Sequence, residues 1–234
     1  MSFHILTWNV FDSQENRDRR ICAIKQVLQF ADADLVALQE TWGDEQWNSM
    51  IDDFRKEGYH VAATHYPGLT ILSRLPILMS YVIHTSTGIR ALRSIVHLRR
   101  SKLIFTNVRL PWGEDFRDVR ERTLTELRAS THVFDRAEIL AGDLNSEPWS
   151  SPLTALMTTQ MNRPFTNTDP GLSDTCRIDN PLAARYCDVP CKLDYVFVRG
   201  PLRSLSSQIL AEKPIAGVYP SDHAAIYVEL ELIS

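Results

Sequence analysis

Two units of this sequence each contain a strand-like apolar run, a helix-like segment and a second apolar run, and in both units the strand-like runs end in polar residues. In chain order, the segments are residues 3–8, 17–31 and 35–38 in the first unit and residues 102–110, 115–134 and 137–141 in the second. Apolar side chains at Ile21, Ile24 and Leu28 give the helical spacing of the first unit, and short continuous apolar runs are typical of buried strands. Two such units predict a pseudo-twofold pair of β–α–β layers that meet at one site.

Most of the remaining sequence reads as further strands. These strand-like runs are residues 59–65, 69–73, 76–83, 91–98, 193–199, 203–211 and 223–232. No linker-like change of composition divides the chain, so we expect a single domain over residues 1–234. The expected class is α/β with many antiparallel strand pairs, most simply two packed sheets with helices outside.

Length and composition exclude several classes of protein. With 234 residues, 44% of them hydrophobic and 23% charged, the chain can bury a sizeable core, which excludes disorder and low complexity. It contains no apolar run of the ~18 residues that a membrane span needs, and it opens on a strand-like run without a secretion signal. We expect a monomer without stable membrane association.

Cysteine usage bounds the redox setting. Four cysteines are too few for a disulfide scaffold in a chain of this length. Cys176, Cys187 and Cys191 lie close together in the sequence, but no fourth Cys or His nearby completes a tetrahedral metal site. We therefore expect a cytoplasmic protein in which this segment is a loop of free thiols or carries one adventitious disulfide.

The charge of the chain limits how it can bind nucleic acid. A net charge of −4 argues against binding by bulk charge alone. Arg makes up 20 of the 25 basic residues, which favours bidentate recognition of phosphate but is also expected from a GC-rich genome. Ten basic and five acidic residues fall between Arg90 and Arg128, and they predict either a surface for a polyanion or a helix face with Glu–Arg pairs.

Seven polar residues stand at or beside the ends of predicted strands. They are Asn9, Glu40, Asp143, Asn145, Asp194, Asp222 and His223. Any one of them is most simply a turn former or a helix N-cap. Together they belong to five short motifs: Thr7-Trp8-Asn9, Leu38-Gln39-Glu40, Gly142-Asp143-Leu144-Asn145-Ser146-Glu147-Pro148, Leu193-Asp194-Tyr195-Val196 and Pro220-Ser221-Asp222-His223.

The order of these motifs resembles the endonuclease/exonuclease/phosphatase superfamily, which includes pancreatic deoxyribonuclease, abasic-site endonucleases, deadenylases and neutral sphingomyelinases. The resemblance runs from residue 7 to residue 225, nearly the whole chain. It implies a four-layer α/β sandwich of the deoxyribonuclease I type, in which two packed mixed β-sheets are flanked by helices. It also implies a divalent-metal-dependent phosphoesterase.

The resemblance further implies a metal site and its ligands. Glu40 is the principal ligand, with Asn9 and Asp222 nearby. Carboxylate and amide oxygens are hard ligands that suit Mg²⁺ or Mn²⁺, which are the expected cofactors.

The remaining motif residues receive roles in the reaction from the same resemblance. Asp143 orients or deprotonates the attacking water, and Asn145 donates to the phosphoryl oxygens in the transition state. His223 contacts the phosphate. Asp194 keeps His223 cationic, because a neighbouring carboxylate raises the pKa of an imidazole.

One position departs from the family pattern. Most members have Asn-Thr-His-Leu before the second long helix, whereas this sequence has Asn107-Val108-Arg109-Leu110. His97 lies on the preceding strand and is out of register, so it does not replace the missing histidine, and abasic-site endonucleases manage with Tyr at this place. Arg109 is a permanent cation with two donors, and we interpret it either as a phosphate clamp or as the mark of a degenerate site with reduced activity.

Four tryptophans fall within a few residues of a motif position: Trp8, Trp42, Trp112 and Trp149. They predict either an aromatic rim that stacks bases or holds an apolar substrate group, or ordinary core packing.

The expected substrate is nucleic acid, cleaved by a nuclease or an end-processing enzyme. The alternative is a phosphatase or phosphodiesterase that acts on a small molecule or a lipid head group, as sphingomyelinases do. A third hypothesis is a non-catalytic binding module on the same fold, which Arg109 favours and the seven matched residues oppose.

Overall fold

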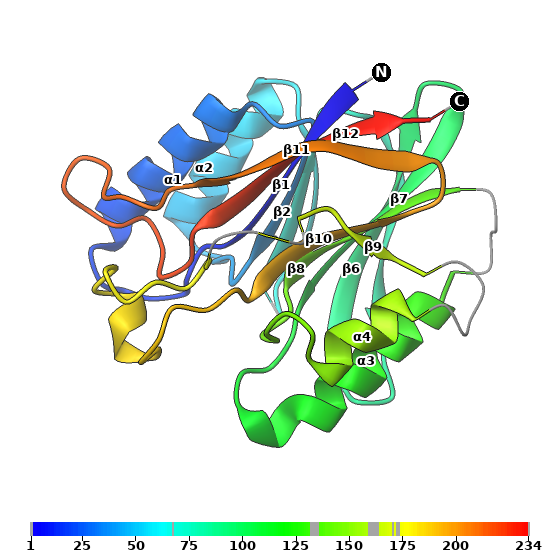
Figure 1. Cartoon of the computed structure of the whole chain (residues 1–234). Coiled ribbons are helices and arrows are strands. Elements are labelled where there is room, and N and C mark those ends of the chain that lie inside the picture. Colours follow the sequence, from blue (N-terminus) through cyan, green and yellow to red (C-terminus); the bar gives the residue numbers. More distant parts are fainter. Residues whose placement is uncertain are drawn as a thin grey trace.

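The computed structural model describes residues 2–66, 68–131, 136–158, 164–169, 171 and 174–233, and within them two six-stranded sheets pack against each other (Figure 1). In spatial order the first sheet contains β11 (Leu202–Leu210), β12 (Ala225–Leu232), β1 (Ser2–Asn9), β2 (Leu35–Gln39), β4 (Leu69–Ser73) and β3 (His60–Thr64). The second contains β5 (Ile77–His84), β6 (Arg90–Leu98), β7 (Ser101–Arg109), β8 (Ala137–Asp143), β10 (Asp194–Arg199) and β9 (Thr166–Asn167).

Helices cover the outer face of each sheet. They are α1 (Arg17–Ala31) and α2 (Glu45–Lys56) on the first sheet, and α3 (Arg117–Ala129) and α4 (Ser151–Met157) on the second (Figure 1), with short 3₁₀ turns η1 (Glu114–Phe116) and η2 (Ala183–Arg185). Apolar residues of both sheets, such as Ile5, Phe105 and Ile139, form the core between them. The four-layer α/β sandwich expected from the sequence is confirmed.

The two β–α–β units occupy equivalent places in the two sheets. β1 pairs with β2 in parallel, with Asn9 opposite Gln39, and β7 pairs with β8 in parallel, with Arg109 opposite Asp143. The carboxyl ends of parallel neighbours lie at the same sheet edge. Each unit therefore delivers two strand ends to one edge of its sheet, as the sequence predicts.

The structure adds elements that the sequence reading did not predict. α2, α4 and the two-residue strand β9 are the additions, and the helix expected over 115–134 ends at Ala129, with residues 132–135 outside the described residues. The signal for α2 is present in the sequence, because Asp44 accepts a hydrogen bond from Trp47 N at 2.8 Å as an N-cap. In the described residues, no helix is long and apolar enough to cross a membrane.

A buried amide network joins the two sheets next to the strand ends. Asn107 of β7 donates through Nδ2 to the carbonyl oxygens of Leu38 (2.9 Å) and Thr70 (3.0 Å), which belong to the other sheet. Its Oδ1 accepts from Gln39 Nε2 at 2.8 Å. Both side chains are fully buried, so every one of these bonds replaces a bond to water. The network fixes how the two sheets meet at the edge that carries the polar residues.

We predict that Asn107→Ala lowers the free energy of unfolding by about 1–3 kcal/mol for each carbonyl group that it leaves unpaired, because a buried acceptor without a donor carries its full desolvation cost. Denaturant unfolding followed by circular dichroism measures the change. Asn48→Ala is the matched control, since Asn48 is exposed and its side chain donates to Gly43 O at 3.2 Å. Equal stability of the two variants would show that the amide network does not hold the sheets together.

Candidate active site

The ends of both sheets converge on one pocket. A cavity of about 220 Å³ is lined by seven of the eight residues singled out in the sequence: Asn9, Glu40, Arg109, Asp143, Asn145, Asp222 and His223. They stand at the ends of β1, β2, β7 and β8 and before β12. Asp194, the first residue of β10, is fully buried and hydrogen-bonded to His223. The fold therefore brings all eight residues together.

Glu40, the residue directly after β2, is held by three groups. Its Oε1 accepts from Asn9 Nδ2 at 3.1 Å and forms an ion pair with Arg109 Nη2 at 2.7 Å, while its Oε2 accepts from the backbone N–H of Asp12 at 3.1 Å. Burial by itself would raise the pKa of Glu40. The charge of Arg109, followed by the hydrogen bonds from Asp12 and Asn9, outweighs burial and lowers that pKa below its ordinary value. Glu40 is thus a carboxylate that stays ionised.

Asp143 has the opposite electrostatic character. It ends β8, is 1% exposed, and accepts hydrogen bonds from Asn9 Nδ2 and Asn145 Nδ2, each at 3.0 Å. In the strand register it lies directly opposite Asp194. Burial and the nearby charge of Asp194 raise the pKa of Asp143 to about 7. A carboxylate with this pKa can accept and release a proton near neutral pH.

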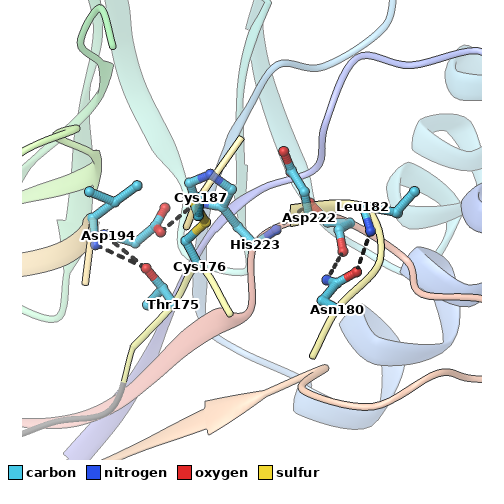
Figure 2. Close-up of a disulfide and its surroundings, with 10 residues drawn as sticks. Thr175, Cys176, Asn180, Leu182, Cys187, Asp194, Asp222 and His223 are labelled. Carbon is cyan, nitrogen blue, oxygen red and sulfur yellow. Dashed lines mark hydrogen bonds and ion pairs between the residues drawn. A yellow bond between two sulfur atoms is a disulfide. The ribbon is translucent and has the colours of Figure 1, made fainter. Parts of the chain in front are cut away.

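His223 and Asp194 form a buried hydrogen-bonded pair (Figure 2). His223 Nδ1 lies 2.7 Å from Asp194 Oδ2, which leaves the other ring nitrogen for a different partner. Burial opposes a charged imidazole, but the charges of Asp194 and Asp222 overcome it and raise the pKa of His223 well above its ordinary value. The pair therefore presents a cationic imidazolium on the wall of the pocket.

Two asparagines turn their amide nitrogens toward the carboxylates. Asn9 Oδ1 accepts from Phe11 N at 3.0 Å, so its NH₂ group bridges Glu40 and Asp143. Asn145 uses both amide hydrogens, one on the carbonyl oxygen of Leu110, the first residue after β7, at 2.8 Å and one on Asp143. In this arrangement both amides orient carboxylates. The predicted roles of Asn9 at a metal and of Asn145 at the phosphate remain predictions.

Sequence reasoning missed the residues that support and wall the pocket. Ser221 Oγ donates to Asn9 O at 2.6 Å and accepts from His223 N at 3.1 Å, so it ties the last motif to the first. Its place in the Pro-Ser-Asp-His motif is the signal that identifies it. Phe11 and Tyr186 line the pocket with ring centroids 6.1 Å apart, and no local pattern marks either residue.

The four tryptophans divide between the two interpretations. Trp8 and Trp42 are 0% and 5% exposed and belong to the core beneath α1 and α2. Trp112 is 62% exposed and lines the pocket, whereas Trp149, 78% exposed, is not among the residues that line it. Of the two interpretations, core packing therefore holds for Trp8 and Trp42, and the aromatic lining of the pocket consists of Trp112, Phe11 and Tyr186.

Three members of the basic cluster between Arg90 and Arg128 are structural. Arg93 is 1% exposed and donates to Thr106 Oγ1 at 2.9 Å, and Arg120 donates to the carbonyl oxygens of Pro111 and Gly113. Arg128 is also buried, and its guanidinium donates to backbone carbonyls of α4 and the residue after it. These three guanidinium groups replace water around buried carbonyl or hydroxyl oxygens and do not face a polyanion.

The pocket has the charge and donor set for a divalent cation. Its charged side chains, with Asp194 behind them, are four carboxylates and two cations: Glu40, Asp143, Asp194, Asp222, Arg109 and His223. Burial, with the charge of Glu40, raises the pKa of Asp222 although His223 opposes this. The raised pKa values of Asp143 and Asp222 come first from burial and then from neighbouring negative charge, and a bound cation would favour the ionised form of both carboxylates. The carboxylate oxygens of Glu40 and Asp222 are hard donors of the type that Mg²⁺ and Mn²⁺ prefer.

Comparison with known proteins gives one family and many structures of the same fold. Residues 6–223 match the model of the Endonuclease/Exonuclease/phosphatase family. Truncated TDP2 from Caenorhabditis elegans superimposes with a TM-score of 0.81 at 16% identity, covering 98% of this chain and 97% of that one. TDP2 from D. rerio, complexed with a single-strand DNA product, gives 0.82 at 19% identity, with 98% and 99% covered.

A third solved structure is the human Nocturnin catalytic domain with a bound sulfate anion. Its TM-score is 0.78 at 16% identity, and the match covers 98% of this chain and 93% of that chain. At these identities the structural matches establish the fold, and no curated protein sequence matches the chain.

We predict that Asp194→Asn lowers the pKa of His223, because the variant keeps the desolvation of the imidazole and removes the charge that offsets it most. An NMR titration of the histidine ring signals measures the shift, with the signals of the other histidines as internal reference. Asp222→Asn is expected to shift the same pKa less, since Asp222 is the smaller of the two stabilising charges. An unchanged pKa in Asp194→Asn would contradict the pairing.

Proposed function

Because the chain belongs to the Endonuclease/Exonuclease/phosphatase family, whose members hydrolyse phosphate esters, we propose that it is a divalent-metal-dependent phosphodiesterase that acts on nucleic acid, as a nuclease or an end-processing enzyme. One observation carries the proposal. A single pocket contains an ionised carboxylate at Glu40, a proton-accepting carboxylate at Asp143 and a cationic imidazole at His223. Hydrolysis of a phosphodiester needs a cation site, a base for water and a positive charge on the phosphoryl oxygens.

We assign the metal to Glu40 and Asp222, with Asn9 beside them. A bound Mg²⁺ or Mn²⁺ would supply charge neutralisation at the phosphoryl oxygens and the leaving oxygen. The protein's own part is to keep Glu40 ionised, which it does through Arg109 and the backbone N–H of Asp12. Asn9 holds Glu40 and Asp143 at a fixed separation by donating to both.

Asp143 takes the proton of the attacking water in this proposal. Two amides hold one of its oxygens, and the backbone N–H of Asn145 binds the other at 3.0 Å, so the carboxylate has one orientation before substrate arrives. His223 presents its outer ring nitrogen to a phosphoryl oxygen while Asp194 holds its inner nitrogen. For Asn145 to donate to the phosphate, it must exchange one of its two present hydrogen bonds for the substrate.

Nucleic acid is favoured over a small substrate by the surroundings of the pocket. A second cavity of about 360 Å³ shares Trp112 and Asn145 with the first and continues to Arg117 near the start of α3. Trp112 is exposed and offers a ring on which a base can stack, and Arg117, which pairs with Glu114 in this structure, offers a guanidinium for the next phosphate. The bound single-strand DNA product in D. rerio TDP2 supports the same class of substrate.

The alternative is a phosphodiesterase for a small molecule or lipid head group. It is favoured by the small volume of the first cavity, about 220 Å³, and by its apolar wall of Phe11, Tyr186 and Leu193. An activity assay on a panel of substrates decides between nucleic acid and a small substrate. The panel contains generic phosphodiesters and phosphomonoesters, single- and double-stranded DNA and RNA, and a phosphocholine lipid, each with Mg²⁺, Mn²⁺ or chelator. Turnover on none of them in either metal would favour the non-catalytic binding module.

We further propose that residues 1–234 form a single domain, that the protein is a monomer, and that it works in the cytoplasm. The free thiol of Cys22 is exposed, which suits a reducing compartment. Gel filtration with light scattering tests the oligomeric state.

Asp143→Asn is expected to reduce kcat by about 10²–10⁴, the loss that accompanies removal of a general base, and to leave the fold intact because the amide has the same shape. Steady-state kinetics on the best substrate of the panel measures the loss. Asp52→Asn is a matched control, since Asp52 is an exposed carboxylate of α2 paired with Arg55 at the surface. A kcat within a few-fold of the parent enzyme would remove Asp143 from the reaction.

Arg109→Ala is expected to change two quantities in opposite directions. Removing the ion pair frees Glu40 Oε1, so less Mg²⁺ should be needed for half-maximal activation. Removing a cation from the pocket should raise KM for the substrate, and Arg109→Lys should restore only part of the loss because it lacks the two-donor fork.

Arg109→His tests whether the site is degenerate. It restores the usual family residue, so activity on generic phosphodiesters should rise if arginine only impairs the site, and activity on the preferred substrate should fall if arginine is adapted to it. Arg90→Ala, at an exposed arginine of β6, is the control. Unchanged metal dependence and KM in Arg109→Ala would make Arg109 a bystander.

A further inference from the structure

A disulfide lies beside the His223–Asp194 pair (Figure 2). Cys176 and Cys187 are joined by an S–S bond, and both residues line the same cavity as Glu40, Asp143 and His223. Of the two outcomes expected from the sequence for this segment, the structure therefore has the disulfide. The bond is also reachable by small solutes that enter the pocket, because Cys187 is half-buried while Cys176 is buried.

Cys176 belongs to a short backbone ladder that supports the His223–Asp194 pair. Its N–H and C=O bind Cys191 at 2.9 and 3.0 Å, and on its other side it forms an isolated bridge with His223. The preceding residue, Thr175, accepts from Asp194 N at 3.3 Å through Oγ1 (Figure 2). One end of the disulfide is thus fixed to the residues that hold the imidazole.

The other end of the disulfide, Cys187, directly follows Tyr186 in the chain. Sequence separation between the two cysteines is 11 residues, so the bond closes a short loop. This loop is also anchored at Asn180, whose Nδ2 donates to Ser221 O at 2.8 Å, and at the buried Ala183. Beyond Ala183 it is held by Tyr186 N and Cys187 N, which donate to Ala183 O at 2.9 and 3.0 Å, by a ring contact of Tyr186 with Phe11, and by an exposed ion pair between Arg185 and Glu15. Exposed ion pairs contribute little to stability. The disulfide adds the covalent constraint on the end of the loop that carries Tyr186.

A third thiol lies within reach of the bond. Sulfur atoms of Cys176, Cys187 and Cys191 lie within 4.8 Å of one another. Burial, with the negative charge of nearby carboxylates, raises the pKa of Cys191 to about 12, so it is a thiol at neutral pH. Since the thiolate is the attacking species in exchange, Cys191 does not displace the existing bond.

We propose that Cys176 and Cys187 are a redox modification site for small disulfides and dithiols, and that their oxidation fixes the Tyr186 wall of the catalytic pocket. In the forward reaction the thiolate of Cys187 attacks a small disulfide such as oxidised glutathione and releases one thiol. Cys176 then attacks the mixed disulfide and releases the second. Two electrons and two protons pass from the protein to the small disulfide, and a dithiol reverses the reaction.

The effect on catalysis rests on the proposed function, but the thiol chemistry does not. Reduction is expected to release the loop end with Tyr186, so KM should rise by roughly 3- to 10-fold, the loss of one aromatic contact, with kcat little changed. The loop contains a built-in reporter, because trypsin cuts after arginine and Arg185 is exposed within it. Cleavage after Arg185 should be slow in the oxidised protein and fast in the reduced one.

The test uses the full chain equilibrated in glutathione buffers of increasing oxidised fraction. Alkylation followed by peptide mass mapping measures the Cys176–Cys187 bond, limited trypsin digestion measures the loop, and kinetics measures KM in the same samples. Cys187→Ser should abolish the redox response of all three readouts. Cys22→Ser, at the exposed cysteine of α1, and Cys191→Ser should both retain it.

Several results would overturn the proposal. They are the absence of a linked Cys176–Cys187 peptide from the oxidised parent protein, a linked peptide that contains Cys191 instead, equal trypsin cleavage in both states, or one equivalent of tightly bound zinc that protects the three thiols from alkylation. If Cys187→Ser does not fold, the same three measurements on the parent protein with and without dithiothreitol still test the proposal. A redox-dependent bond in a protein that turns over no phosphate ester would reject the proposed function and leave the modification site in place.

Discussion

The crowding of carboxylates in one small pocket is the constraint that the rest of the site satisfies. Glu40, Asp143 and Asp222 line a cavity of about 220 Å³, with Asp194 directly behind. Like charges at this density raise carboxylate pKa values and oppose folding, unless donors and cations are placed among them. The four carboxylates differ in their hydrogen-bonded partners. Glu40 pairs with Arg109, Asp194 with His223 and Asp222 with the Ser221 hydroxyl, whereas Asp143 accepts from amide groups. These different partners produce the ionised Glu40 and the proton-accepting Asp143.

The two-sheet architecture explains how residues from five separate segments meet with such precision. Each parallel β–α–β unit fixes two strand ends at one edge, and the Asn107–Gln39 amide network locks the edges of the two sheets together. Rigid strands rather than loops therefore position Glu40 and Asp143. The loop that carries Cys187 is the contrasting element, because it lies outside both sheets and is held by a cross-link, a buried hydrogen bond from Asn180 and surface contacts. Loops tolerate sequence change and suit contacts that differ between substrates, whereas groups that transfer protons need the fixed positions that strands provide.

Sequence reasoning reached the framework of the site because strand ends are a local property with a fixed geometric consequence. Apolar runs that end in Asn9, Glu40 and Asp143 predict strands, and parallel pairing then places their ends together. Contacts made across the interface between the sheets have no such local signal. The ion pair of Arg109 with Glu40 depends on how the sheets pack, and the choice of Cys187 rather than Cys191 as the partner of Cys176 depends on the path of a loop.

Arg109 gives the pocket a property that a histidine in its place would not give. A histidine beside Glu40 would lose its charge as pH rises, and its electrostatic attraction to the carboxylate would then weaken. A guanidinium stays charged over the whole physiological range, so Glu40 faces a permanent counter-ion whether or not a metal is bound. In the proposed function, a cation at Glu40 either shares Oε1 with Arg109 or binds Oε2, which accepts from the Asp12 N–H. Arg109 is thus the counter-ion of Glu40 in this structure, and a phosphate clamp is the second role that we propose for the same side chain.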